Sequence, residues 1–210
     1  MIKKHLKLLI ATSIIILLPI IVGIILWDKL PNEIPVHWNT AGEADNFSNK
    51  PFAVFGFPLI LLIVQWGCIF ATLADPKKKN HSSKMRYLIF WLIPVLSLLL
   101  ALVTYCAALG VTVPVGMVAS LFIGILFVIL GTFLPNCKQN YTIGIKIPWT
   151  LHSEENWNRT HRLACPVWIT GGIVIALAGV FDLFWLMIAA LFGMVLLPIV
   201  YSYILYRKGI

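Results

Sequence analysis

Apolar residues occur in long unbroken runs along this chain, separated by short polar segments. Six runs contain no Asp, Glu, Lys, Arg or His: Leu8–Trp27, Pro51–Ala74, Tyr87–Gly110, Val111–Leu134, Leu163–Phe181 and Leu183–Tyr206. A bilayer core about 30 Å thick takes about 20 apolar residues per helical crossing. Transmembrane barrels have short alternating segments instead, so the pattern predicts an all-α integral membrane protein, a bundle of six transmembrane helices.

Composition agrees with this prediction. The 210 residues are 60% hydrophobic and 11% charged, and the mean hydropathy is +0.93, far from the values of soluble domains. The first run lacks a small-x-small cleavage site, so we interpret it as an uncleaved span. Six spans use most of the chain and leave no room for a separate soluble domain.

The basic residues predict the orientation of the spans. With a cytoplasmic N-terminus, all but Lys29 and Lys50 of the 16 Lys and Arg residues fall in cytoplasmic segments, as the positive-inside rule requires. Both termini are then cytoplasmic. The net charge of +8 follows from this topology and from contact with anionic membrane lipid, so no direct nucleic-acid partner is expected.

The spans themselves suggest packing more than transport. Coupled transporters and pumps usually carry ionisable groups inside the membrane, whereas the polar span residues here include Gln65, Thr104 and Thr170, which we interpret as links between helices. Small residues in the fifth span predict close helix approach: Gly171, Gly172, Ala176 and Gly179. The four cysteines have no zinc-ligand spacing, and we predict no metal, cofactor or catalytic residue.

The first long loop, Leu30–Pro51, is predicted to be extracytoplasmic. Its prolines favour an extended strip over Asn32–Trp38, which Asn39, Thr40 and Gly42 follow as a turn. It also contains a small polar cluster of Glu33, His37, Glu43 and Asp45, whose spacing matches no metal-ligand pattern. Two interpretations stay open: an interfacial Trp38 with solvated acids, or a partner-binding surface.

The second long loop, residues 135–162, is predicted to be cytoplasmic. Ser153 suits a helix N-cap, and Glu155 with Arg159 makes an i, i+4 pair, so a helix is expected to begin here and continue into the fifth span. Trp149 and Trp157 are then expected at headgroup depth, with Arg159 and Arg162 near anionic lipid. His152 and His161 are interpreted as polar interfacial residues.

The tripeptide LPN occurs at Leu30–Asn32 and again at Leu134–Asn136, each time after the first span of a three-span half. Such halves would have opposite orientations, as in inverted-repeat transporters. A transporter or exporter of a small amphipathic compound is therefore an alternative. A membrane enzyme using His37 with the nearby acids is a weaker one, because no nucleophile or acid/base geometry is readable.

The two loops together resemble the SdpI family of bacterial immunity proteins against a secreted sporulation-delaying peptide toxin. The first loop matches the N-terminal membrane module of that family, LP-x-x-IP-x-HWN-x-x-G-x-x-D followed by Lys. The matching residues are Leu30, Pro31, Ile34, Pro35, His37, Trp38, Asn39, Gly42, Asp45 and Lys50. The second loop resembles the C-terminal signature through Asn140, Gly144, Pro148, Trp149, Thr150, Leu151, Glu154, Trp157, His161 and Arg162. Lys146 and Ile147 replace the expected Arg and Thr.

The resemblance implies a multi-pass protein of the bacterial plasma membrane that confers resistance to an antimicrobial peptide. It also implies signalling, in which the toxin-engaged protein holds a transcriptional repressor at the membrane. We expect a two-span module over residues 1–75 and a four-span module over residues 76–210. In the first loop the candidate partner-binding residues are Pro35, His37, Trp38, Asn39, Gly42, Asp45 and Lys50; in the second, partner-binding or structural residues are Asn140, Gly144, Lys146, Pro148, Trp149, Thr150, Glu154, Trp157 and Arg162.

Overall fold

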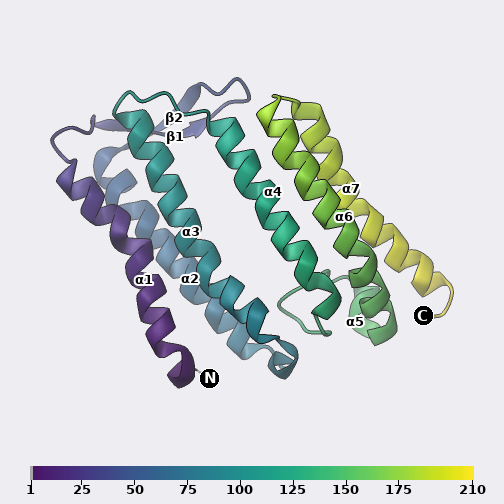
Figure 1. Ribbon diagram of the computed structural model, residues 1–210. Coiled ribbons are helices and arrows are strands. Elements are labelled where there is room, and N and C mark those ends of the chain that lie inside the picture. Colours follow the sequence, from purple (N-terminus) through teal and green to yellow (C-terminus); the bar gives the residue numbers. More distant parts are fainter. Residues whose placement is uncertain (1) are drawn as a thin grey trace. The chain divides into compact units, whose positions relative to one another are not determined.

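The computed structural model describes residues 2–210, with side chains from His5 onward. Lys3 and Lys4, which contributed to the predicted orientation, thus lie outside the described side chains. Six long helices are apolar enough to cross a membrane, which confirms the predicted fold class. They are α1 (Ile2–Ile25), α2 (Phe57–Ala74), α3 (Ser83–Ala108), α4 (Val115–Phe133), α6 (Glu154–Val180) and α7 (Phe184–Arg207) (Figure 1). A short helix, α5 (Pro148–His152), precedes α6.

The chain packs as two compact units. The first contains α1, α2, α3 and the connection between α1 and α2; the second contains α4 to α7 together with residues 74–85, which link α2 to α3. The division into sequence modules 1–75 and 76–210 concerns the motifs and stays a prediction.

Side chains on α3 and α2 join the helices of the first unit by donating to main-chain carbonyls. The Gln65 Nε2 atom lies 3.0 Å from the carbonyl oxygen of Phe90, and the Ser97 hydroxyl lies 3.0 Å from that of Ile16. The bilayer core contains no water that could bind these polar side chains, so they find their partners on neighbouring helices. The predicted packing role of Gln65 is confirmed.

The connection between α1 and α2 forms an antiparallel β-hairpin of β1 (Glu33–Trp38) and β2 (Ala44–Asn49). The turn is closed by the Asn39 side chain, whose Oδ1 accepts from the main-chain N–H groups of Ala41 and Glu43 at 2.9 and 3.0 Å. Gly42 adopts a φ of 79°, which favours glycine. The predicted extended strip and turn are confirmed, whereas β2 was not expected.

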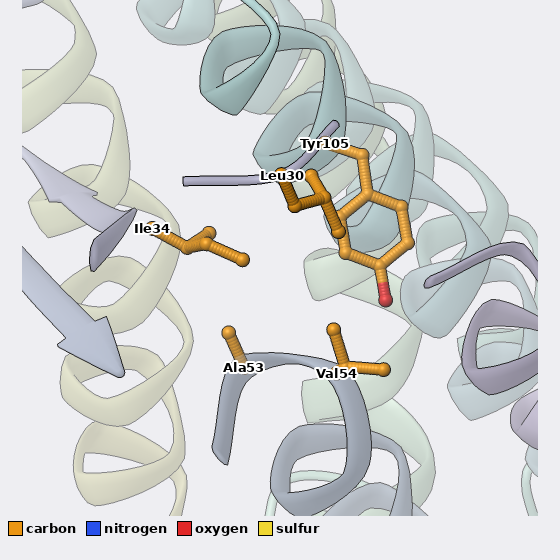
Figure 2. Close-up of a cluster of buried hydrophobic side chains, with 5 residues drawn as sticks. All are labelled: Leu30, Ile34, Ala53, Val54 and Tyr105. Carbon is orange, nitrogen blue, oxygen red and sulfur yellow. The ribbon is translucent and has the colours of Figure 1, made fainter. Parts of the chain in front are cut away.

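One face of the hairpin is fixed to its own unit by a cluster of buried side chains, shown in Figure 2: Leu30, Ile34, Ala53, Val54 and Tyr105. The second end of the hairpin is held by Lys50, whose Nζ donates to the carbonyl oxygen of Trp27 at 3.0 Å and lies 5.2 Å from the Trp27 ring centroid. The hairpin is thereby held against the helices of its own unit.

Small residues allow α4 and α6 to approach closely in the second unit. A Cβ atom on Gly172 would lie 2.5 Å from the carbonyl oxygen of Gly124, a distance that no side chain tolerates. Similarly, a Cβ atom on Gly179 would overlap the Ser120 side chain. The predicted close approach through the glycines of the fifth span is confirmed.

Candidate functional site

The outward face of the hairpin borders a groove of about 440 Å³, here called the hairpin groove. Its walls are the hairpin, the end of α3 and the segment that follows α3. They include Pro31, Glu33, Pro35, Trp38, Gly42, Ala44, Phe47, Ala107, Ala108, Gly110, Val111 and Val113. Phe47 and Val111 are 50% and 55% exposed. The groove therefore offers apolar surface to a partner instead of burying it within the chain.

One acidic side chain, Glu33, lines this groove, and the hairpin segment carries further acids. Residues 28–50 contain four acids and two lysines, so this segment is acidic in a chain whose net charge is +8. One of these lysines, Lys50, is already engaged with Trp27. The hairpin thus presents negative charge beside exposed apolar surface.

The predicted residues of the first loop have three different placements. Pro35, Trp38 and Gly42 line the groove. The turn is built by Asn39, and Lys50 anchors the hairpin as described above.

The remaining two predicted residues pair with one another. The His37 Nδ1 atom lies 2.5 Å from Asp45 Oδ1, and the two side chains are 66% and 42% exposed. Within the described residues, no group of three or more His, Cys, Asp or Glu is arranged to hold a metal ion. A solvent-exposed pair of this kind can contribute charge and shape to a binding surface.

The loop of the second unit is built differently, around the side chain of Asn140, which is 1% exposed. Its Oδ1 accepts from the main-chain N–H groups of Thr142 and Ile143 at 2.9 and 2.7 Å. Its Nδ2 donates to the carbonyl oxygens of Lys138 and Ile143, both at 2.9 Å. Asn140 therefore satisfies buried backbone groups that the irregular loop cannot pair by itself.

The buried side chains of Trp157 and His161 pack beneath this loop and bond to its backbone. Trp157 is fully buried, donates from Nε1 to the Cys137 carbonyl oxygen at 2.6 Å, and stacks on His161 with ring centroids 4.1 Å apart. The His161 Nε2 atom accepts from the Ile145 N–H at 3.0 Å. An accepting ring nitrogen carries no hydrogen of its own. Full burial of Trp157 within the chain, where we expected headgroup depth, favours the structural alternative for this residue.

Gly144 leaves room for that stack. It has a φ of +115°, and a Cβ atom there would lie 2.6 Å from His161 Nε2 and 3.0 Å from the Trp157 ring. Both the conformation and the space therefore require glycine. Its place in the sequence motif is explained by packing.

The other predicted residues of this loop also brace it. Thr150 Oγ1 donates to the Ile145 carbonyl oxygen at 2.7 Å, and Lys146 Nζ donates to that of Thr142 at 2.9 Å. Pro148 begins α5, and Trp149 contacts Tyr203 of α7 with ring centroids 5.1 Å apart.

The predicted start of α6 is confirmed. The Ser153 side chain accepts from the Asn156 N–H at 3.2 Å, which is the bond expected of an N-cap. Glu155 and Arg159 form an ion pair at 2.5 Å.

A buried carboxylate that the sequence did not reveal ties residues 74–85 to this loop. Asp75 accepts from the main-chain N–H groups of Lys77 and Tyr141 at 2.7 and 2.9 Å. It also accepts from the Thr142 hydroxyl at 2.7 Å and from His81 Nε2 at 3.1 Å. Burial by itself raises the pKa of this carboxyl group, but these four donors outweigh burial, so the pKa lies below its ordinary value of 3.8.

Gln139 reinforces the same connection. Its Oε1 accepts from Lys77 Nζ, while its main-chain carbonyl oxygen accepts from Asn80 Nδ2 at 2.7 Å. Asp75 follows an apolar span and precedes three lysines, which is also how a solvated loop acid appears. What distinguishes the buried acid from a solvated one is its bond to Tyr141, which is 66 positions further along the chain.

The side chains of Glu154 and Arg162 line a cleft of about 520 Å³ beside the start of α6, here called the polar cleft. Its other lining residues are Asn80, Pro135, Asn136, Cys137, Lys138, Gln139 and Asn158. Of the predicted residues in this loop, Glu154 and Arg162 are therefore the two that the fold presents together to a ligand or partner.

Six apolar helices in the described residues, with these two loops among their connections, define a multi-pass bacterial membrane protein. Residues 136–202 match the SdpI/YfhL protein family, and residues 14–62 match a domain of unknown function, DUF1648. The immunity protein SdpI of Bacillus subtilis (strain 168) is 29% identical over 207 residues, which cover 95% of this chain and 96% of that protein. No solved structure matches. The predicted resemblance to the SdpI family is confirmed.

Proposed function

We propose that this protein gives a bacterium immunity to a secreted antimicrobial peptide by binding that peptide in the hairpin groove. The observation that carries the proposal is the combination of exposed apolar side chains with Glu33 in the groove, within a segment that is acidic. The groove volume of about 440 Å³ lies in the range of specific ligand pockets. Similarity to the B. subtilis immunity protein over nearly the whole chain supports the same function.

The chemistry of the groove favours a cationic amphipathic peptide. Trp38 and Phe47 offer aromatic surface, and aromatic residues dominate the binding energy of many interfaces when a partner covers them. Glu33 lines the groove, while Glu43 and Asp45 belong to the same acidic segment. Such charges accelerate the encounter with a cation and discriminate against anionic partners.

The direct test is binding of the sporulation-delaying peptide to the full chain in phosphatidylcholine nanodiscs. Phe47→Ala combined with Trp38→Ala is expected to weaken peptide binding by at least about tenfold, because two aromatic contacts are lost. The matched control is Phe70→Ala, which truncates an aromatic of similar exposure, 52%, on α2. Equal affinity of the wild-type chain and the double variant would contradict binding in this groove.

Topology forms the second part of the proposal. Residues 74–85 contact the 139–142 segment through Asp75 and Gln139. In a six-span chain these two connections follow an even number of crossings, so they lie on one side of the membrane, as their contact requires. Their lysines and arginines support a cytoplasmic location. The hairpin then faces the exterior, where a secreted peptide arrives, and both termini are cytoplasmic.

Signalling is the finer part of the proposal. A cytoplasmic repressor would be retained at the membrane through the exposed surface of the 135–162 loop once the hairpin groove is occupied. Cell fractionation after peptide addition tests this directly. A repressor that stays soluble in cells that are nevertheless protected would separate immunity from signalling.

A further inference from the structure

The polar cleft carries a pair of cations that the described chain does not neutralise. Lys138 and Arg162 both line it and both are exposed. Among residues 5–210, neither side chain forms a hydrogen bond or an ion pair, whereas Arg159 on the preceding turn of α6 is paired with Glu155 at 2.5 Å. The two arginines of this segment therefore have different roles.

The remaining side chains of the cleft complete a set of donors. Asn158 and Arg162 are four residues apart on α6 and share one helix face, and Asn136 lines the same cleft from the 3-10 turn Leu134–Asn136 that follows α4. Amide N–H groups with a guanidinium and an ammonium group are the donors that bind phosphate oxygens. Glu154, the one acid among the lining residues, can accept hydrogen bonds from hydroxyl groups.

The position of the cleft favours a ligand that is itself in the membrane. Arg162 directly precedes Leu163, where the apolar part of α6 begins, so the guanidinium lies at the boundary between the polar loop and hydrocarbon. Basic pockets at the cytoplasmic ends of transmembrane helices are suited to anionic lipid headgroups. We propose that the polar cleft binds an anionic phospholipid, with its phosphate at Lys138 and Arg162 and a headgroup hydroxyl at Glu154.

Phosphatidylglycerol is the suitable probe because it combines one phosphate with a polyol headgroup. The full chain, purified in detergent, is titrated with phosphatidylglycerol or phosphatidylcholine, and retained lipids are counted by native mass spectrometry. Arg162→Gln is expected to reduce phosphatidylglycerol retention by about tenfold, since a bidentate charged contact is lost. Lys138→Gln is expected to reduce it several-fold. Retention of phosphatidylcholine should be unchanged.

Arg159→Gln is the matched control, because it removes the same charge one turn away on the same helix. It should retain phosphatidylglycerol within about twofold of the wild-type chain, since this arginine is engaged with Glu155. An equal loss in Arg159→Gln and Arg162→Gln would overturn the proposal, because it would show only a general attraction of lipid to positive charge.

A parallel titration with inorganic phosphate separates a lipid site from a site for a soluble phosphate compound. Phosphatidylglycerol binding that depends on Arg162 and persists in millimolar phosphate supports the proposal. Binding of inorganic phosphate without selective retention of phosphatidylglycerol overturns the lipid assignment. Because the substituted residues are exposed, the melting temperatures of the variants should stay close to that of the wild-type chain, and that comparison verifies their folding.

Discussion

The hairpin and the 135–162 loop use their polar residues in opposite ways. On the hairpin, His37 and Asp45 pair with each other while more than a third of each side chain is exposed. In the loop, Asn140 and His161 are 1% exposed and bond to the backbone around them. Polar sequence motifs of similar density thus produce an exposed surface in one place and a buried framework in the other.

The physical reason for this difference is the demand of the backbone for hydrogen bonds. The hairpin satisfies its own main-chain groups through the β1–β2 ladder, which leaves side chains free to face outward. The loop has no ladder, so the side chains of Asn140, Thr150 and Asp75 supply the missing partners. Substitutions should therefore affect stability in the loop and binding at the hairpin.

The largest expected effect on stability comes from Asp75→Asn. An amide would place a donor group against four donors that now face a carboxylate, and the free energy of unfolding should fall by about 3 kcal/mol. Denaturant unfolding of the purified chain measures this loss. The control is Asp182→Asn, which makes the same substitution at an exposed residue with a φ of 54°, a conformation that Asn also tolerates. Equal stabilities for the two variants would contradict the assigned role of Asp75.

Glycine substitutions sharpen the comparison because both regions contain a glycine with positive φ. Gly144→Ala should reduce the free energy of unfolding by about 2 kcal/mol or more, since the new Cβ atom meets His161 in addition to the strained conformation. Gly42→Ala, where a Cβ atom meets nothing within 4 Å, should cost about 1 kcal/mol from backbone strain alone. Thermal unfolding of both variants measures the difference. A larger loss of stability for Gly42→Ala than for Gly144→Ala would contradict the prediction.

Acid should weaken the second unit through the same carboxylate. The pKa of Asp75 in the folded state lies below its ordinary value of 3.8, so the unfolded state binds the proton first as the pH falls. The stability contributed by Asp75 is therefore fully present above that ordinary value and is lost as the pH falls through the folded-state pKa. Unfolding measured between about pH 5 and pH 3 should show a steeper loss in the wild-type chain than in Asp75→Asn. Parallel curves would exclude this source of acid sensitivity.

The smallest expected effect on stability belongs to the hairpin acids. Glu33→Gln combined with Glu43→Gln should change the free energy of unfolding by less than about 0.5 kcal/mol, because both side chains are exposed. Association of a cationic peptide with the chain should nevertheless slow several-fold at low ionic strength, and the difference should shrink as salt is added. Stopped-flow binding at two salt concentrations gives both results, and an unchanged rate at low salt would remove the electrostatic part of the proposal.

The elements with local signals could be predicted from the sequence. Uninterrupted apolar runs located the six spans, Ser153 located the start of α6, and Pro31 and Pro35 indicated the extended strip. The second strand of the hairpin, ADNFSN, has no alternating apolar pattern, so nothing local indicated it. Burial of Trp157 and the bonds of Asp75 depend on partners far along the chain, which no local pattern contains.

The candidate site was predictable in part for the same reason. The motif residues Pro35, Trp38 and Gly42 were found because they lie in one continuous loop, and they do line the hairpin groove. Phe47 and Val111 escaped prediction, because one belongs to the unexpected strand and the other to the segment after α3. Lys138 and Arg162 are 24 residues apart, and only the fold places both in the polar cleft.

Survival of a peptide-sensitive bacterium that expresses this chain is the most direct test of immunity through the hairpin. Cells are challenged with the sporulation-delaying peptide and, separately, with an unrelated pore-forming peptide, at equal membrane levels of each variant. We predict protection against the first peptide alone, lost in Trp38→Ala with Phe47→Ala and kept in Phe70→Ala. Absence of protection by the well-expressed wild-type chain, or full protection by the double variant, would contradict the account.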